Sequence, residues 1–425
     1  MIQELKIKNF LSFKDEIVFS FEANADKNLE DYYIHEPVPG VRLLKLALVY
    51  GANASGKSNL INAFGFLRNF VFNIPQSKEV EIDFHPFAFS PEVNPIGEFE
   101  LVFYVGAIKH VYKLEVAKQY IKSEKLYFYP GTQPAIIFER YFDDNTNTSV
   151  IEFGTKLKIS NVAKEEISLK TLKNSSVLST IYYSKIFNQN IKKALDWFED
   201  KFLPVVGSNN HFIDRLQNSF TEEKLKTFVL KMLNKADKSI SDITIINKSE
   251  PFSEYLLKFM YGKTAKQLKA EYSNEQVEVI KPYTYFQQDV EKDGELVPCQ
   301  VEKSELSEGL KRYYELMFPL YDCLNNNAFL ALDELDTSLH SLLLESLIKE
   351  FILQSKSSQL IITIHDISLL NKKELLRKDA IWFTEKRSDQ STRLFSVTDF
   401  PKFRKELSYY NYYKSGKFGA IPNID

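Results

Sequence analysis

The residues best suited to chemistry begin with a glycine-rich segment, residues 51–58, which reads GANASGKS. It matches the pattern G-x-x-x-x-G-K-[ST], in which backbone N–H groups at a helix start surround phosphate oxygens. An apolar run at residues 46–50 precedes the segment and a helical pattern follows it, so the loop joins a buried strand to a helix. We therefore predict a phosphate-binding loop rather than an ordinary glycine-containing turn.

Each fixed residue of this loop has an expected role. Gly51 and Gly56 let the backbone turn toward the phosphates, Lys57 contacts the β- and γ-phosphates, and Ser58 binds Mg²⁺. The residues expected to surround the phosphates of a nucleotide are Gly51, Ala52, Asn53, Ala54, Ser55, Gly56, Lys57, Ser58 and Asn59.

A second group of reactive side chains ends an apolar run, residues 328–334, which reads AFLALDE. Asp333 is expected to hold the magnesium, and Glu334 to orient or deprotonate the attacking water. Standing alone, such a run would be better explained as a buried strand that ends in a solvated acidic turn. Together with a phosphate-binding loop, it predicts the hydrolytic half of the site.

A histidine completes this group. Residues 360–364, LIITI, form another apolar run, and His365 follows it directly. At the end of a strand beside a phosphate site, this side chain can contact the γ-phosphate or the attacking water. We predict that role for His365, with a purely structural histidine as the alternative.

Residues 306–309, LSEG, precede a helical pattern with apolar Leu316, Met317 and Leu320. Ser307 and Gly309 would then lie at a helix N-terminus, which attracts anions. We add both residues to the expected nucleotide ligands. A plain helix cap formed by Ser307 is the alternative.

The elements that must position these groups follow a simple order. Residues 1–155 are rich in β-type runs with turn signals between them, and predict an antiparallel β-subdomain beside the phosphate loop. Residues 156–280 show helical stripes, which predict a helical insertion packed as a subdomain. Residues 281–425 form the second lobe and carry Ser307, Asp333 and His365. The fold class is therefore α/β, with one nucleotide site assembled from both ends of the chain.

Composition excludes several classes of protein. The 425 residues carry a net charge of −3, so there is no global positive field to attract DNA, and nucleic-acid binding would have to be local or borne by a partner. The two cysteines, Cys299 and Cys323, lack metal-ligand spacing and fit a reducing cytosol. No signal-peptide pattern or membrane-spanning apolar run appears, so we expect a cytoplasmic protein.

Several segments together resemble bacterial ABC-type ATPases related to RecF, SMC and the overcoming-lysogenisation-defect nucleases. More narrowly, the chain resembles the stand-alone ATPase subunits of two-gene phage-defence modules of the PARIS, AbiL and Rlo kinds. Besides the loop, the segments that carry this resemblance are IQELKIKNFLSF at the start, SELSEGLKR, LALDELDTSLH, LIITIHD, DAIWFTEK and the terminal SGKFGAIP. The resemblance covers both ends of the chain and leaves out the middle.

The resemblance implies an ABC-type P-loop ATPase head with two lobes, an antiparallel β-subdomain and a RecA-like core. In such heads the residues matching Ser307 and Gly309 face the γ-phosphate held by another subunit, which implies a homo-oligomer with nucleotide between its heads. The implied partners are a separate effector, a TOPRIM-like or RloB-like nuclease, and a phage-encoded trigger. The alternatives are a RecF-like DNA clamp gated by ATP and a scaffold that binds ATP but barely hydrolyses it.

The chain departs from this pattern in places. No glutamine matches the one that links the metal to the helical region, and Gln189, the nearest, has unmatched surroundings and is left out of the site. Leu310 stands where related defence ATPases often have threonine, so we expect slow turnover. The middle segment has no sustained heptads, which excludes a long coiled-coil arm. The 60 residues after His365 are too few for a fused TOPRIM nuclease.

Overall fold

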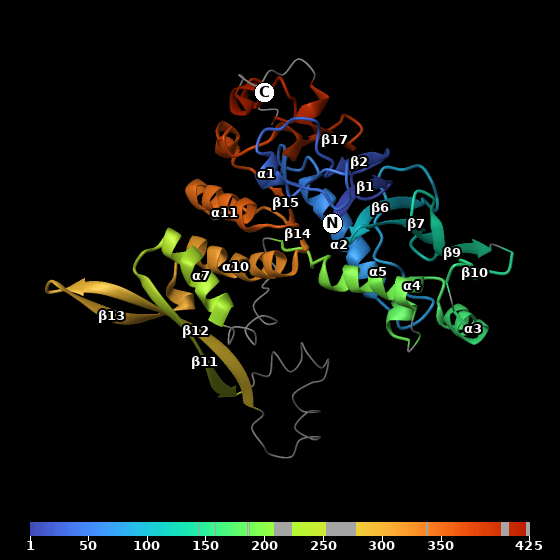
Figure 1. Ribbon diagram of the computed structural model, residues 1–425, viewed down its shortest axis with the longest axis horizontal. Coiled ribbons are helices and arrows are strands. Elements are labelled where there is room, and N and C mark those ends of the chain that lie inside the picture. Colours follow the sequence, from blue (N-terminus) through green and yellow to red (C-terminus); the bar gives the residue numbers. More distant parts are fainter. Residues whose placement is uncertain are drawn as a thin grey trace. The chain divides into compact units, whose positions relative to one another are not determined.

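The computed structural model describes residues 1–143, 145–157, 159–184, 186, 188–207, 223–251, 278–336, 339–400 and 408–421. The chain divides into two compact units, shown in Figure 1. Unit 1 comprises residues 1–210 and 322–425, and unit 2 comprises residues 211–321. None of the helices in the described ranges is long and apolar enough to span a bilayer.

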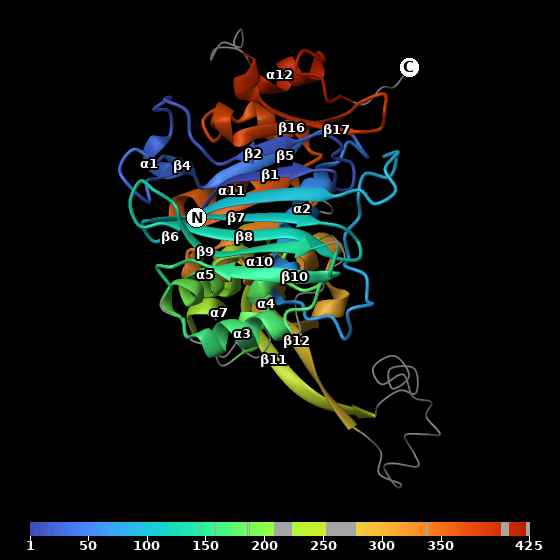
Figure 2. The ribbon, with the colours of Figure 1, turned by 90° about the vertical axis from the view of Figure 1, so that its right-hand side faces the viewer.

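A seven-stranded antiparallel sheet forms one layer of unit 1, in the order β10-β9-β8-β7-β6-β1-β2, and Figure 2 shows its strands side by side. From Glu124 on, β8 alternates buried and partly exposed side chains, as expected for a strand with one covered face, whereas β6 is buried throughout Leu101–Tyr104. Its members are β1 (Ile2–Lys8), β2 (Ile17–Ser20), β6 (Gly97–Val105), β7 (Ile108–Val116), β8 (Ile121–Tyr129), β9 (Ala135–Asp143) and β10 (Thr148–Phe153). The antiparallel β-subdomain predicted for the N-terminal part is confirmed.

A five-stranded sheet forms the second layer, in the order β14-β15-β5-β16-β17. Its strands are β5 (Leu46–Tyr50), β14 (Phe329–Leu332), β15 (Gln359–Thr363), β16 (Ile381–Lys386) and β17 (Thr392–Ser396). All pairs are parallel except β16 with β17. Every residue of β5 is buried, which explains its unbroken apolar run. Because parallel strands end at one edge, the loops after β5, β14 and β15 meet there.

Helix α2 (Lys57–Phe72) packs between the two sheets through aromatic side chains. Phe64 contacts Phe19 of β2 and Phe329 of β14, with ring centroids 5.9 and 4.8 Å apart. Phe66, on the other side of the helix, lies 5.0 Å from Phe99 of β6. The helix that begins at the phosphate loop is therefore fixed by both layers.

Further elements of unit 1 surround these layers. They are α1 (Glu30–Tyr33), β3 (Ile34–His35), β4 (Leu43–Leu44), α3 (Asn161–Lys170), α4 (Val177–Tyr182), α5 (Gln189–Asp200), α11 (Ser341–Gln354), α12 (Tyr409–Lys414) and the 3-10 helices η3 (Ile367–Asn371), η4 (Lys378–Ala380) and η5 (Val397–Asp399).

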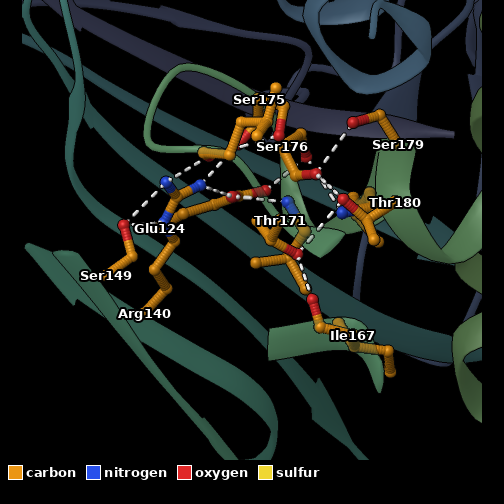
Figure 3. A network of polar contacts seen from close by, with 12 residues as sticks. Glu124, Arg140, Ser149, Ile167, Thr171, Ser175, Ser176, Ser179 and Thr180 are labelled. Carbon is orange, nitrogen blue, oxygen red and sulfur yellow. Dashed lines mark hydrogen bonds and ion pairs between the residues drawn. The ribbon is translucent and has the colours of Figure 1, made fainter. Parts of the chain in front are cut away.

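A buried ion pair joins the seven-stranded sheet to the loop before α4 (Figure 3). Glu124 of β8 and Arg140 of β9 are fully buried, with Arg140 Nη1 3.5 Å from Glu124 Oε2. Arg140 Nη2 also donates to the Leu172 carbonyl oxygen at 2.9 Å, and Glu124 Oε2 accepts the Val177 N–H at 2.9 Å. Each charge therefore has several partners, as a buried charge requires.

Unit 2 contains helix α7 (Glu223–Ala236), a three-stranded antiparallel sheet and a short 3-10 helix, η2 (Lys303–Glu305). The strands are β11 (Ile240–Pro251), β12 (Glu278–Lys292) and β13 (Glu295–Glu302). Helix α10 (Glu308–Asn326) starts in unit 2. The described residues of the segment 156–280 include α3, α4, α5 and α7 and also β11, a strand that the sequence patterns did not predict, while residues 208–222 and 252–277 lie outside the described ones. In the described part of the chain the longest helix is α10, with 19 residues, and this confirms that no long coiled coil lies there.

Candidate functional site

The phosphate loop lies where the sequence predicts, between β5 and α2. Gly56, just before α2, has φ 105°, and a Cβ there would lie 2.3 Å from Thr392 Oγ1. A Cβ on Gly51 would lie 2.4 Å from the carbonyl oxygen of Thr384. Both positions therefore require glycine, because any side chain would push the loop away from β16 and β17.

Lys57 folds back over the loop. Its Nζ donates to the carbonyl oxygens of Gly51 at 2.8 Å and Ala52 at 3.0 Å. Burial lowers the pKa of Lys57, and the nearby carboxylate of Asp333 opposes this shift. A buried ammonium group held by two carbonyls gains stronger partners when anionic phosphate oxygens replace them. The side chain therefore fits a polyphosphate.

Hydroxyl groups from distant parts of the chain hold the loop in shape. Ser55 Oγ lies 2.6 Å from Thr384 Oγ1, and Thr392 Oγ1 donates to the Ser55 carbonyl oxygen at 2.8 Å. Ser12 Oγ lies 2.7 Å from Thr392 Oγ1 and accepts the Asn59 side-chain amide at 2.7 Å. These bonds tie the loop to β17 and to the segment after β1, so its geometry is preorganised.

The two predicted acids follow β14 and share one partner, Thr363 at the end of β15. Thr363 Oγ1 donates to Asp333 Oδ1 at 2.6 Å and accepts the backbone N–H of Glu334 at 2.7 Å. Glu334 has φ 51°, an uncommon conformation for a residue with a side chain. Strained backbone of this kind is concentrated at functional sites.

His365 stands opposite Glu334. Its Nε2 lies 3.7 Å from Glu334 Oε1, and both side chains are partly exposed. Asp336 Oδ2 accepts the backbone N–H groups of His365 at 2.8 Å and Asp366 at 2.5 Å. One carboxylate thus fixes the turn that presents the histidine, and Asp336 is a positioning residue.

These groups open into one cavity of about 1010 Å³ in unit 1. Of the predicted residues, its walls include Asn53, Ala54, Ser55, Gly56, Lys57, Ser58, Asn59, Glu334 and His365. Gly51, Ala52 and Asp333 are not part of the walls, although Lys57 and Thr363 connect them to the site. The cavity also extends along residues 85–95, which the sequence reading did not include.

The C-terminal turn contacts the loop from the outside. The Ala420 carbonyl oxygen accepts the Ala52 N–H at 3.1 Å, and the Ala420 N–H donates to Glu385 Oε1 at 3.0 Å. The Tyr413 hydroxyl donates to the same carbonyl oxygen at 2.8 Å. These contacts give Ala420, which belongs to the segment SGKFGAIP, a structural role at the site.

Ser307 and Gly309 belong to unit 2. Ser307 Oγ accepts the Leu310 N–H at 3.3 Å, so Ser307 caps α10 as its sequence position suggests. Their expected contact with a nucleotide held by another subunit stays a prediction. Gln189 is the first residue of α5 and is not part of the cavity wall, so the structure gives no reason to add it to the site.

Sequence reasoning missed the residues that hold the site rather than perform chemistry. Thr363, Thr384 and Thr392 contact the loop or the acids, yet nothing in their local pattern marks them. Asp336 follows the acids closely and could have been found as a third carboxylate next to the Asp-Glu pair. Ser12 lies in the opening segment that carried the resemblance, but its role depends on a partner 380 residues away.

Comparisons with known proteins agree with these motifs. A family model described as "AAA domain, putative AbiEii toxin, Type IV TA system" matches residues 46–371, which include the loop, Ser307, both acids and His365. No curated protein matches the chain.

The chain also has a distant likeness to solved SMC structures. The SMC head domain from Thermotoga maritima has TM-score 0.42 and 14% identity, covering 93% of this chain and 98% of that one. The SMC head bound to the C-winged helix domain of ScpA has TM-score 0.42 and 13% identity, covering 93% and 97%. An SMC head domain with an extended coiled coil, bound to the C-terminal domain of ScpA derived from Pyrococcus furiosus, has TM-score 0.40 and 12% identity, covering 98% of both chains.

Proposed function

We propose that this chain, which belongs to the AAA domain family of the AbiEii type, binds ATP with Mg²⁺ and hydrolyses it. The observation that carries the proposal is that Lys57, Glu334 and His365 open into the same cavity from the ends of neighbouring parallel strands and from the start of α2. Phosphate binding and water activation can therefore act on one molecule.

Binding would use the loop with one exchange of partners. Backbone N–H groups of the loop and the N-terminus of α2 would contact phosphate oxygens, apart from the N–H groups of Ala52 and Ser55, which already donate to carbonyl oxygens. Lys57 would exchange its two carbonyl partners for β- and γ-phosphate oxygens. Ser58 and Asp333 would hold the magnesium, which needs few protein ligands when phosphates supply the others. When bound, the metal neutralises charge that develops on the phosphate oxygens.

Hydrolysis would proceed by in-line attack of water. The water oxygen forms a bond to the γ-phosphorus, the bond between that phosphorus and the β–γ bridging oxygen breaks, and Glu334 accepts a proton from the water. ADP and phosphate leave. His365, whose Nε2 lies 3.7 Å from Glu334 Oε1, would orient the water or contact the γ-phosphate.

The test is Glu334→Gln, which keeps the shape of the side chain and removes its basicity. We expect phosphate release to fall by at least a hundredfold, on the order of a general base's contribution, while ATP stays bound. If Ser307 and Gly309 complete the site of a second copy, this variant also assembles into a dimer or larger species under ATP, seen by light scattering.

Lys57→Ala is the paired control and should lose both binding and assembly. Unchanged hydrolysis in Glu334→Gln would remove Glu334 from the mechanism. If the wild-type protein binds ATP but releases no more phosphate than Lys57→Ala does, the result would favour a scaffold that binds ATP without hydrolysing it.

The cellular role within this proposal is that of a sensor or scaffold subunit in a bacterial antiphage module that works with a separate nuclease. It is supported by the family description, which refers to a toxin and a type IV TA system, and by the resemblance of the motifs to stand-alone defence ATPases. Plaque counts on cells that carry this gene with its neighbour, wild type against Lys57→Ala, test it. ATP-dependent DNA binding by the chain alone would favour a RecF-like clamp instead.

A further inference from the structure

The cavity continues beyond the phosphate loop to a wall with no assigned role. This wall is the segment between α2 and β6, residues 85–95, here called the 85–95 loop. It contributes His85, Pro86, Phe87, Ala88, Phe89, Ser90, Glu92 and Pro95, and Lys386 at the end of β16 and Gln390 in the turn after it also line the cavity. A nucleotide whose phosphates occupy residues 51–58 must place its base and ribose elsewhere in this space.

The 85–95 loop is fixed at both ends by the segment after β1. The Asn9 side-chain amide donates to the Ile96 carbonyl oxygen at 2.9 Å, and its Oδ1 accepts the Phe87 N–H at 3.0 Å. The Leu11 N–H donates to the His85 carbonyl oxygen at 2.7 Å. A single asparagine therefore closes the loop, which holds a defined position.

That position is defined with respect to the phosphates as well. Ser12 follows Leu11 directly and bonds to Asn59 of α2 and to Thr392, which in turn bonds to Ser55 of the phosphate loop. The two walls of the cavity are thus connected through three side chains. Such a connection sets the spacing between a phosphate site and a second subsite.

Phe89 is the unusual residue of this wall. Its ring is 68% exposed, whereas Phe87 is buried and meets it edge-on, with ring centroids 5.7 Å apart. Phe87 therefore anchors the loop and supports Phe89 from one side. An aromatic ring that is held in place, exposed, and set in the wall of a polar cavity offers a stacking surface for a flat ligand.

We propose that the 85–95 loop is the base-binding wall of the site and that the nucleotide base stacks on Phe89. This inference rests on the proposed function and adds a recognition residue to it. Stacking on an aromatic ring favours every base, so Phe89 contributes affinity for nucleotides over free polyphosphate rather than selection among bases.

The test compares a ligand that has a base with one that lacks it. Calorimetry on the full chain measures the Kd of a non-hydrolysable ATP analogue and of inorganic triphosphate, each with magnesium. Phe89→Ala should weaken the analogue about tenfold and leave triphosphate unchanged, while Phe89→Trp keeps the affinity for both. Lys57→Ala should weaken both ligands.

Val93 provides the matched control, because it lies in the same loop, is 93% exposed and is not part of the cavity wall. Val93→Ala should bind as wild type does. Two results would overturn the base-binding wall and leave the proposed function standing, provided that Lys57→Ala binds both ligands more weakly. In the first, Phe89→Ala binds the analogue as tightly as wild type does. In the second, Phe89→Ala weakens the binding of the analogue and of triphosphate equally. Wild type that binds neither ligand would overturn the proposed function and this wall with it.

Discussion

The hydroxyl of Thr363 holds both acids of the site, because it donates to Asp333 and accepts the N–H of Glu334. Its position at the end of β15, two residues before His365, also connects the acids to the histidine turn. Glu334, with its positive φ, depends on this bond to keep a conformation that its side chain disfavours.

We predict that Thr363→Val lowers the rate of ATP hydrolysis by one to two orders of magnitude and changes the ATP affinity little. This is roughly the effect of displacing a catalytic group by about 1 Å. Valine fills the same space but cannot hold Glu334 or Asp333. Thr363→Ser restores the hydroxyl and should recover most of the rate. Steady-state kinetics settle the matter, and a normal kcat in the valine variant would contradict this role.

For single residues, the sequence indicated which side chains could perform chemistry but not which side chains hold them in position. The positions of Lys57 and Glu334 on the cavity wall could be predicted, because the phosphate-loop pattern fixes Lys57 and an apolar run leads into Glu334, while their chemical roles stay predictions. Thr363 and Thr392 could not, because their partners come from strands whose order in the sheet no local pattern reveals. Phe89 carried no signal either, since an exposed phenylalanine in a loop has no distinctive spacing.

Among the elements, β7 contains a histidine whose surroundings oppose protonation. The His110 ring is 5.3 Å from that of Phe103 and 6.3 Å from that of Phe128, and the residue is buried. Burial lowers the pKa of His110 to about 4, from an ordinary value of 6.5, and the hydrogen bond to the Ile108 carbonyl oxygen only partly offsets this.

This shift predicts a loss of stability in acid. Between pH 6.5 and about 4 the unfolded chain binds a proton at His110 that the folded chain does not, so the free energy of unfolding falls as the pH falls. At pH 5 the loss attributable to this residue is about 2 kcal/mol. Urea unfolding at pH 7.5 and pH 5 should show a smaller difference for His110→Phe than for wild type, while the exposed His85→Gln behaves as wild type.

The buried pair of Glu124 and Arg140 fixes how β8 and β9 meet the loop before α4 (Figure 3). We predict that Arg140→Met lowers the free energy of unfolding by about 3–5 kcal/mol, because Glu124 is left buried without its cation. The double variant with Glu124→Gln should recover part of this loss in urea unfolding. Single and double variants of equal stability would show that the pair contributes only packing.

Sequence patterns predicted the antiparallel sheet of the N-terminal part, because some of its strands, such as β8, alternate buried and partly exposed side chains. The strand β11 was missed for a physical reason. A register shift between Ile240 and Asp242 interrupts its alternation, and β12, its long partner, begins only at Glu278. Pairing between such distant segments produces no local sequence pattern, and for this reason only helices were predicted in this part of the chain.

For the whole molecule, the order of motifs indicated one site built from both ends of the chain, and residues from both ends do line one cavity. Strand β5 lies between β15 and β16, and the loop after it contacts the turn at Ala420. The order of strands within that sheet could not be predicted from the motifs alone, and unit 2 interrupts the sequence of unit 1.

The place of β5 has a consequence for how the protein comes into being on the ribosome. Its fully apolar strand emerges early, yet its neighbour β15 is synthesised roughly 300 residues later, which takes about 15–60 s at usual translation rates. During that interval five buried-type residues lack both partners, and the phosphate loop lacks the strands that hold it. Newborn chains are therefore exposed to aggregation until the later strands are made, and chaperone supply should limit the yield of folded protein.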